Sequence, residues 1–119
     1  MITGGAGFIG ANLVLHWLRH HPDDLVVNFD ALTYAGNLAN LEDVKNLPNY
    51  RFFHGDLRNA LEISKAFSEH NFEAVIHLAA ESHVDRSIHG PADFIETNVT
   101  GTFNLLETAR EFWGDELSN

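Results

Sequence analysis

The sequence predicts an α/β fold built on a parallel sheet with helices on both faces. Short apolar runs that suit buried strands alternate with longer segments whose apolar residues recur at helical spacing. A glycine-rich turn separates the first strand from the first helix. Each of the four predicted strands is followed by glycine or polar residues. Because parallel strands end at the same edge, these residues are expected to gather where a sheet of this class binds ligands.

The first turn is the strongest local signal. Thr3 is followed by Gly4, Gly7 and Gly10 at three-residue spacing, and an apolar segment from Phe8 to about His20 is predicted to be helical. Glycines allow a tight turn and a close approach of the backbone to a ligand. The helix start offers unpaired N–H groups and a positive dipole end. The turn is therefore typical of a pyrophosphate site, although an ordinary strand–helix turn remains the alternative.

The remaining elements complete the alternation of strands and helices. We predict strands at 25–29, 50–54 and within 73–80, and helices at 38–44, 59–70 and 91–113. This order predicts an incomplete Rossmann-like sheet, with about the first four strands and their helices. Four aromatic residues on the last helix are expected to pack in the core, with a partner as the alternative: Phe94, Phe103, Phe112 and Trp113.

An acid ends the second predicted strand. Asp30 lies twenty residues after Gly10. A carboxylate there can accept hydrogen bonds from the adenosine ribose hydroxyls and would repel a 2′-phosphate, so the predicted cofactor is NAD rather than NADP. The alternative is a solvated loop carboxylate. Asp56 follows the third predicted strand, where an acid often caps the next helix.

Composition excludes several classes of function. The chain has 119 residues and a net charge of −10, which argues against a basic nucleic-acid surface. No cysteine is present, so disulfides and thiolate metal sites are excluded. No apolar run approaches membrane-spanning length, and no secretory signal precedes the turn. We expect a cytoplasmic protein without nucleic-acid or membrane partners.

The eight histidines raise the question of a metal site. His16 and His20 have a spacing that can bind zinc on a helix, but no third ligand stands at a matching position. We predict no metal. His77, inside an apolar run, is interpreted as a core residue with a hydrogen-bond partner.

Several segments resemble a known family. The turn at 3–10 is similar to the cofactor turn of extended short-chain dehydrogenases/reductases. More narrowly, the segments at 30–38, 54–56, 78–88 and 97–102 resemble the dTDP-glucose 4,6-dehydratases. The resemblance extends to about residue 113, and it distinguishes the chain from sugar-nucleotide epimerases better than the glycine turn does.

The resemblance implies NAD as the cofactor, dTDP-glucose as the substrate and a role for each matched residue. The pyrophosphate would be lined by Gly4, Gly7, Phe8, Ile9 and Gly10. The adenosine ribose would be held by Asp30, Ala31, Leu32 and Thr33, and adenine by Asp56 and Leu57. The cofactor would lie beside Leu78, Ala79, Ala80, Glu81 and Ser82, and would be contacted by Thr97; Ser82 would also contact the substrate.

A dense polar cluster follows the fourth predicted strand. It contains Glu81, His83, Asp85 and Arg86. It could form a wall of the site, or a salt-bridged loop that shapes the site or a subunit contact. We favour the site for Ser82 and a structural role for the charged residues of the cluster.

The family's reaction oxidises the sugar at C4, removes water across C5 and C6, and returns the hydride to C6, as in rhamnose-type deoxysugar synthesis. The family's Tyr-x-x-x-Lys motif is absent, because Tyr34 and Tyr50 have no lysine four residues later. The Thr-Asp-Glu acid–base triplet is absent too. Tyr would take the C4 hydroxyl proton and Lys would lower its pKa. We therefore predict no catalytic residue in this chain and no dehydratase activity for the chain alone.

Both ends of the sequence suggest a piece of a larger protein. Only Met1 and Ile2 precede the turn, and the chain stops where a sheet of this class would be about half built. We interpret residues 1–119 as the partial NAD-binding domain of a dehydratase that forms a homodimer at full length. One alternative is a stand-alone nucleotide-binding module without chemistry. Another is the matching part of an NAD-dependent sugar-nucleotide epimerase or decarboxylase.

Overall fold

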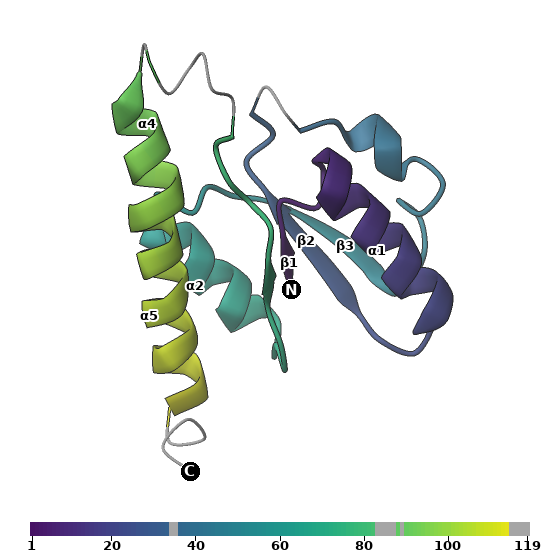
Figure 1. Cartoon of the computed structure of the whole chain (residues 1–119). Helices are drawn as coiled ribbons and strands as arrows, with labels where there is room; N and C mark the ends of the chain where they lie inside the picture. Colours follow the sequence, from purple (N-terminus) through teal and green to yellow (C-terminus); the bar gives the residue numbers. More distant parts are fainter. Residues whose placement is uncertain (34–35, 83–87, 89, 115–119) are drawn as a thin grey trace. The chain divides into compact units, whose positions relative to one another are not determined.

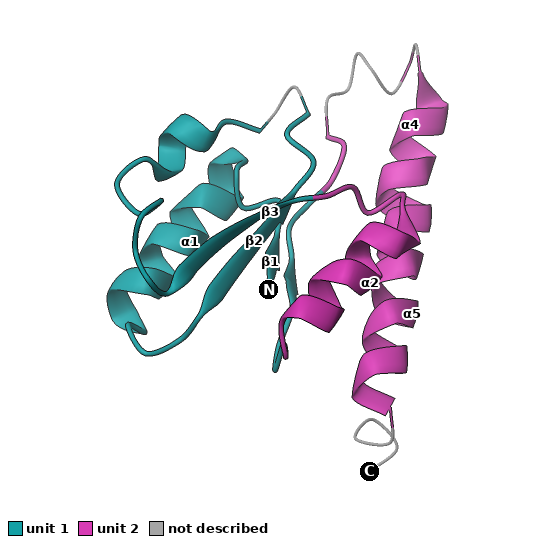
Figure 2. Ribbon diagram, turned by 180° about the vertical axis from the view of Figure 1, so that it is seen from behind, with its two compact units in different colours: residues 1–54, 72–79 teal, residues 55–71, 80–119 magenta. Residues whose placement is uncertain are grey.

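A computed structural model of the chain describes residues 1–33, 36–82, 88 and 90–114. The chain divides into two compact units, which Figure 2 distinguishes by colour. Unit 1 comprises residues 1–54 and 72–79, and unit 2 comprises residues 55–71 and 80–119. Among the predicted features, His83, Asp85 and Arg86 lie outside the described residues.

Unit 1 contains a four-stranded parallel sheet (Figure 1). The strands are β1 (Ile2–Thr3), β2 (Val26–Asp30), β3 (Tyr50–His54) and β4 (Ile76–His77), in the order β3-β2-β1-β4. Because β2 and β4 lie on opposite sides of β1, the strand order reverses between β1 and β4. The predicted α/β class and parallel sheet are confirmed, and ligands of such sheets bind at this reversal.

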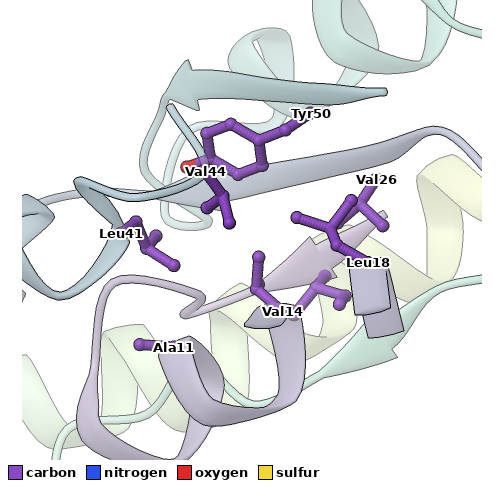
Figure 3. Packing of buried hydrophobic residues seen from close by; sticks show 8 residues of the cluster. Ala11, Val14, Leu18, Val26, Leu41, Val44 and Tyr50 are labelled. Carbon is purple, nitrogen blue, oxygen red and sulfur yellow. The ribbon is translucent and has the colours of Figure 1, made fainter. Parts of the chain in front are cut away.

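Helix α1 (Phe8–His20) packs on one face of the sheet of unit 1. Figure 3 shows the buried side chains that meet there, including Val14 and Leu18 of the helix and Val26 of β2. Fully burying such a side chain contributes about 1.5–3 kcal/mol. Val14 and Leu18 of the predicted apolar segment are thus buried, whereas Ile9, near its start, is 70% exposed.

The connection between β2 and β3 is also anchored in this core. It contains η1 (Leu38–Leu41), a 3₁₀ turn that is shorter than the predicted helix at 38–44. The side chain of Asn37 accepts from the N–H of Ala39 and caps the start of the element. Leu41 and Val44 are both buried in the cluster with Val14, so side-chain burial rather than a regular helix fixes this segment.

Unit 2 is helical in its described part. Helix α2 (Ala60–Glu69) is followed, after the return of the chain to β4, by α4 (Pro91–Ile95), the π-helical turn η2 (Glu96–Thr100) and α5 (Gly101–Trp113). The helix predicted at 91–113 is therefore interrupted by a wider turn. No helix in the described ranges has the length and apolar character needed to cross a membrane.

Helices α2 and α5 pack against each other within unit 2. Ile63 and Ala66 of α2 are buried, as are Leu105 and Ala109 of α5. The ring of Phe67 contacts two aromatic rings of α5, at centroid distances of 5.4 Å from Phe112 and 6.0 Å from Trp113. This contact joins the middle of the sequence to its end.

One prediction about this helix was wrong. Phe103 is 61% exposed and Phe112 is 46% exposed, so neither is a core residue. The buried positions of α5 recur instead at Gly101, Leu105 and Thr108. An exposed apolar stripe lies on another face of this helical segment, and its members are Ile95, Val99, Phe103 and Leu106.

Candidate functional site

The glycine turn of unit 1 lies against the end of β4. Gly4 has φ +72°, a left-handed conformation, and its N–H donates to the carbonyl of Phe29 at 2.9 Å. A Cβ added to Gly4 would lie 2.6 Å from the nitrogen and 2.7 Å from the Cα of Ala79. Both the conformation and the contact therefore require glycine.

The other two glycines of the motif have different surroundings. A Cβ on Gly10 would lie 2.7 Å from the carbonyl carbon of Gly4 and 2.8 Å from the Cα of Gly5, so α1 rests directly on the turn. Among the residues that the structure describes, a Cβ on Gly7 would meet only the Gly4 oxygen, at an ordinary 3.4 Å. The φ of Gly7 is −76°, which any residue adopts. Contacts within the chain therefore do not explain glycine at position 7, but the approach of a ligand would.

The start of α1 offers donors next to Gly7. No side chain in the described part of the chain caps the helix, and no acid stands in its first turn. The first intrahelical bond runs from Ala11 N–H to the Gly7 carbonyl at 2.8 Å. The N–H groups of Phe8, Ile9 and Gly10 thus precede the first intrahelical donor. Donors of this kind, at the positive end of a helix, suit phosphate oxygens.

Asp30 connects the turn to the segment after β2. The residue is only 9% exposed, so the alternative of a solvated loop carboxylate is wrong. Oδ2 accepts from Ala6 N–H at 2.9 Å, and Oδ1 accepts from Leu32 N–H at 2.7 Å. Leu32 has φ +55°, a conformation that costs a non-glycine residue about 1–3 kcal/mol. A carboxylate has about four acceptor positions, so about two remain for ribose hydroxyls.

Thr3 holds the chain after β4 beside the turn. Its Oγ1 lies 3.1 Å from Leu78 N, 3.2 Å from Ala79 N and 2.7 Å from Nδ1 of His77. Because the two N–H groups occupy its lone pairs, the hydroxyl proton is left for His77, which we assign as neutral with its proton on Nε2. Burial lowers the pKa of His77, in agreement with that form. His77 thus has the predicted hydrogen-bond partner, but it is only partly buried and is not a core residue.

In unit 2, Asp56 is held by the residue two positions later. Its carboxylate accepts from the backbone N–H of Arg58 at 2.9 Å and from the guanidinium at 2.7–3.1 Å. These side-chain hydrogen bonds keep the pKa of Asp56 below its ordinary value. Asp56 does not cap α2, because the cap is the side chain of Asn59, which accepts from Leu61 N–H at 3.1 Å.

Leu57 is fixed by α5. It is buried, its carbonyl accepts from Nδ2 of Asn104 at 2.9 Å, and a Cβ on Gly101 would lie 3.0 Å from its own Cβ. Its N–H makes no hydrogen bond within the described part of the chain. A donor therefore stands next to the acceptor of Asp56, the pair that the Watson–Crick edge of adenine requires.

The segment after β4 is clamped by a residue that the sequence reasoning did not assign to the site. The side chain of Asn98, in η2, accepts from Glu81 N–H at 2.7 Å and donates to the Glu81 carbonyl at 2.9 Å. Oε1 of Glu81 is buried without a partner among the described residues. Ser82 is exposed, Ala80 precedes the clamp, and Thr97 is half-buried in the same turn. An asparagine inside a helical pattern was the available signal, since its amide competes with the helix backbone.

The histidine pair of α1 gives no metal geometry. The rings of His16 and His20 are stacked, with centroids 4.1 Å apart. Among the residues that the structure describes, no group of three His, Cys, Asp or Glu residues could hold a metal ion.

The predicted residues thus fall into two sets. Unit 1 brings together the three glycines, the segment from Asp30 to Thr33, and Leu78 with Ala79, through the bonds of Thr3 and Asp30. Unit 2 holds Asp56 with Leu57 at the start of α5, and Glu81 with η2.

Two curated relatives carry the name dTDP-glucose 4,6-dehydratase. The chain is 53% identical over 113 residues to a dTDP-glucose 4,6-dehydratase of Escherichia coli. The aligned region covers 95% of this chain and 31% of that protein. It is 56% identical to the dTDP-glucose 4,6-dehydratase of Shigella flexneri, with the same coverage. The chain spans about a third of the length of these relatives. The resemblance inferred from the sequence segments is confirmed.

Solved structures agree on the fold. DesIV, a dTDP-glucose 4,6-dehydratase from Streptomyces venezuelae with NAD and TYD bound, superposes with a TM-score of 0.86 at 49% identity, over 93% of this chain and 35% of that one. A UDP-glucose 4-epimerase from Thermus thermophilus in complex with NAD gives 0.81 at 35% identity, over 93% of this chain and 33% of that one. The Rossmann-like class is therefore confirmed. The profile of one family, described as GDP-mannose 4,6 dehydratase, matches residues 1–118. Since the match covers nearly the whole chain, the protein belongs to the GDP-mannose 4,6 dehydratase family.

Proposed function

We propose that this chain is the NAD-binding part of a dTDP-glucose 4,6-dehydratase. The observation that carries the proposal is the space beside Gly7, where a Cβ would contact only the Gly4 oxygen among the described residues. The N–H groups at the start of α1 and the buried carboxylate of Asp30 belong to the same unit. A dinucleotide needs a close backbone approach for its pyrophosphate and an acceptor for its ribose. The NAD in the DesIV complex supports the same cofactor.

The residue assignments follow the geometry of each unit. The pyrophosphate is placed at Gly4, Gly7 and the N–H groups of Phe8, Ile9 and Gly10. The adenosine ribose is placed at Asp30 and the backbone of 31–33, and adenine at Asp56 and Leu57. Leu78 to Ser82 and Thr97 are assigned to the rest of the cofactor. The carboxylate of Asp30 would repel a 2′-phosphate, which favours NAD over NADP.

The proposed substrate of the whole protein is dTDP-glucose, with Ser82 as its contact in this chain. The substrate loses the elements of water across C5 and C6, and the product is dTDP-4-dehydro-6-deoxyglucose. NAD would accept the hydride from C4 and return it to C6. Neither Tyr34 nor Tyr50 has a lysine four residues later, so we expect the 119-residue chain alone to convert no substrate.

The exposed apolar stripe supports a homodimer for the whole protein. Ile95, Val99, Phe103 and Leu106 are each 58–65% exposed on consecutive turns of the helical segment. Contiguous apolar surface of this kind is covered in most proteins by a partner. The proposed partner is a second copy of the protein, which would present the same stripe. The proposed compartment of the protein is the cytoplasm.

An epimerase is the second candidate, because UDP-glucose 4-epimerases share the fold at 30–35% identity. The test has two parts. The chain is titrated with NAD and NADP by calorimetry, and we expect NAD to bind more tightly. The DNA on both sides of the reading frame is then sequenced, and the complete protein is incubated with dTDP-glucose, UDP-glucose or GDP-mannose.

Mass spectrometry separates the outcomes. Loss of one water from dTDP-glucose supports the dehydratase. Conversion of UDP-glucose to an isomer without loss of mass identifies an epimerase, and loss of water from GDP-mannose instead shows that the substrate assignment is wrong. A reading frame that ends at Asn119, with NAD binding and no turnover, identifies a stand-alone module.

A further inference from the structure

The carboxylate of Asp56 accepts several hydrogen bonds from a single neighbouring residue, Arg58. The guanidinium of Arg58 reaches both of its carboxylate oxygens, with Nη2 at 2.7 Å and Nε at 3.0 and 3.1 Å. The backbone N–H of the same arginine adds a contact at 2.9 Å. Charge-assisted, forked pairs of this kind fix both the rotamer and the plane of the carboxylate.

The backbone beneath the pair is fixed as well. The N–H of Asp56 donates to Oε2 of Glu62 at 2.8 Å, and its carbonyl accepts from Asn59 N–H at 3.0 Å. The next residue is held by the amide of Asn104 at 2.9 Å. The main chain of Asp56 is therefore held by its own hydrogen bonds, and Arg58 sets the orientation of the carboxylate alone.

The other charges near Arg58 do not explain this arrangement. Its Nη1 lies 3.7 Å from Asp93 and 4.0 Å from Glu96, and both acids are more than half exposed. Exposed ion pairs at such distances contribute about 0–1 kcal/mol. The guanidinium fork is directed at Asp56 instead, whose side chain is only 30% exposed.

We propose that Arg58 is a positioning residue that makes Asp56 selective for a 6-aminopurine. Three N–H groups of Arg58 occupy about three of the four acceptor positions of the carboxylate, and about one remains. Because the carboxylate stays ionised beside the guanidinium, that position can accept but cannot donate. It fits the exocyclic amine of adenine and repels the 6-oxo group of hypoxanthine. The N–H of Leu57 fits adenine N1.

This inference rests on the proposed function, which places adenine at Asp56. Its test compares NAD with nicotinamide hypoxanthine dinucleotide, which differs at the 6-position of the purine. Dissociation constants for both are measured on the whole chain and on the longer protein that contains it. These constants are compared between the unsubstituted protein and three variants, Arg58→Ala, Arg58→Lys and Arg110→Ala. Arg110 is the matched control, because it is an exposed arginine of unit 2 paired with Glu107 at 2.8 Å.

We expect Arg58→Ala to reduce the preference for NAD roughly tenfold, the value of one oriented hydrogen bond to a charged group. Arg58→Lys keeps the charge but not the planar fork, and it should lie between the two. Arg110→Ala should leave the preference unchanged. In an Asp56→Ala background, Arg58→Ala should have no further effect on the preference, because Arg58 acts through Asp56.

Two results overturn the inference. If Arg58→Ala weakens both dinucleotides equally, Arg58 supports only the loop. If the preference survives in Arg58→Ala, Asp56 does not depend on it. The failure of the proposed function looks different, because the unsubstituted protein would then bind neither dinucleotide. A thermal melt of each variant identifies any loss of binding that comes from unfolding.

Discussion

Gly7→Ala is the sharpest test of the pyrophosphate site, because it separates binding from folding. The added Cβ meets only the Gly4 oxygen at 3.4 Å, and the backbone angles of Gly7 suit alanine. Alanine is a poorer helix N-cap than glycine by roughly 0.5–1 kcal/mol, and the loss of chain entropy on folding falls by about 0.4–1 kcal/mol. The two terms nearly cancel, so stability should change by less than about 0.5 kcal/mol.

Binding should respond very differently. If the pyrophosphate lies on Gly7, the new methyl group occupies its space, and overpacking of this kind costs about 1–3 kcal/mol. The dissociation constant for NAD should therefore rise about 5- to 150-fold. Urea denaturation gives the stability, and calorimetric titration gives the dissociation constant on the same protein.

Gly10→Ala is the matched control at the same spacing in the motif. Its Cβ would meet the Gly4 carbonyl carbon and the Gly5 Cα inside van der Waals contact, and backbone atoms cannot move aside as a side chain can. We expect a loss of about 1–3 kcal/mol of stability together with weaker binding. Unchanged NAD affinity in Gly7→Ala would refute the placement of the pyrophosphate on the turn.

Three further predictions concern the groups that hold the site. Asp30→Asn leaves one amide oxygen for two backbone N–H groups, so it should cost about 1–3 kcal/mol of stability and reduce the preference for NAD over NADP; denaturation and paired titrations measure both. Asn98→Ala removes both bonds to the Glu81 backbone and should cost a similar amount, with weaker NAD binding; Asn12→Ala, on the exposed surface of α1, is the control. Burial lowers the pKa of His77 in the folded state. The contribution of neutral His77 to the free energy of unfolding is therefore complete above the unfolded pKa of about 6.5 and is lost as pH falls below it. The stability difference between the original chain and His77→Gln, from urea midpoints between about pH 5 and pH 8, should shrink toward the acid end; a constant difference would contradict the Thr3–His77 assignment.

Local signals predicted the elements well where one rule determined the outcome. The strand at 50–54 was predicted with its observed bounds, and α2 differs from its prediction by one residue at each end. The prediction of β4 was too long, because β4 pairs with β1 at only two positions. The π turn of η2 was not predictable from periodicity, since its width depends on contacts of the folded unit. The exposure of Phe103 was missed because apolarity alone does not show which stripe of a helix is buried.

The site shows the same division. Gly4, Gly10 and Asp30 were predicted from spacing, because the motif encodes a turn and a strand end, and they remain candidates for the cofactor site. Arg58 and Asn98 were not assigned to the site, because each acts on another residue's carboxylate or backbone and no pattern in the sequence names that partner. Asp56 was predicted from its place after a strand, but the orientation of its carboxylate depends on Arg58.

Three polar residues in or beside the candidate site hold the backbone of that site. Thr3 binds the N–H groups of Leu78 and Ala79, Asp30 binds those of Ala6 and Leu32, and Asn98 binds both polar groups of Glu81. Substitution at any of these positions must change stability and binding together, so lost NAD affinity there would not by itself identify a contact. Gly7 is different, because no close contact with the described residues requires glycine there. An effect at Gly7 therefore reports on the ligand, and the other positions should be interpreted relative to it.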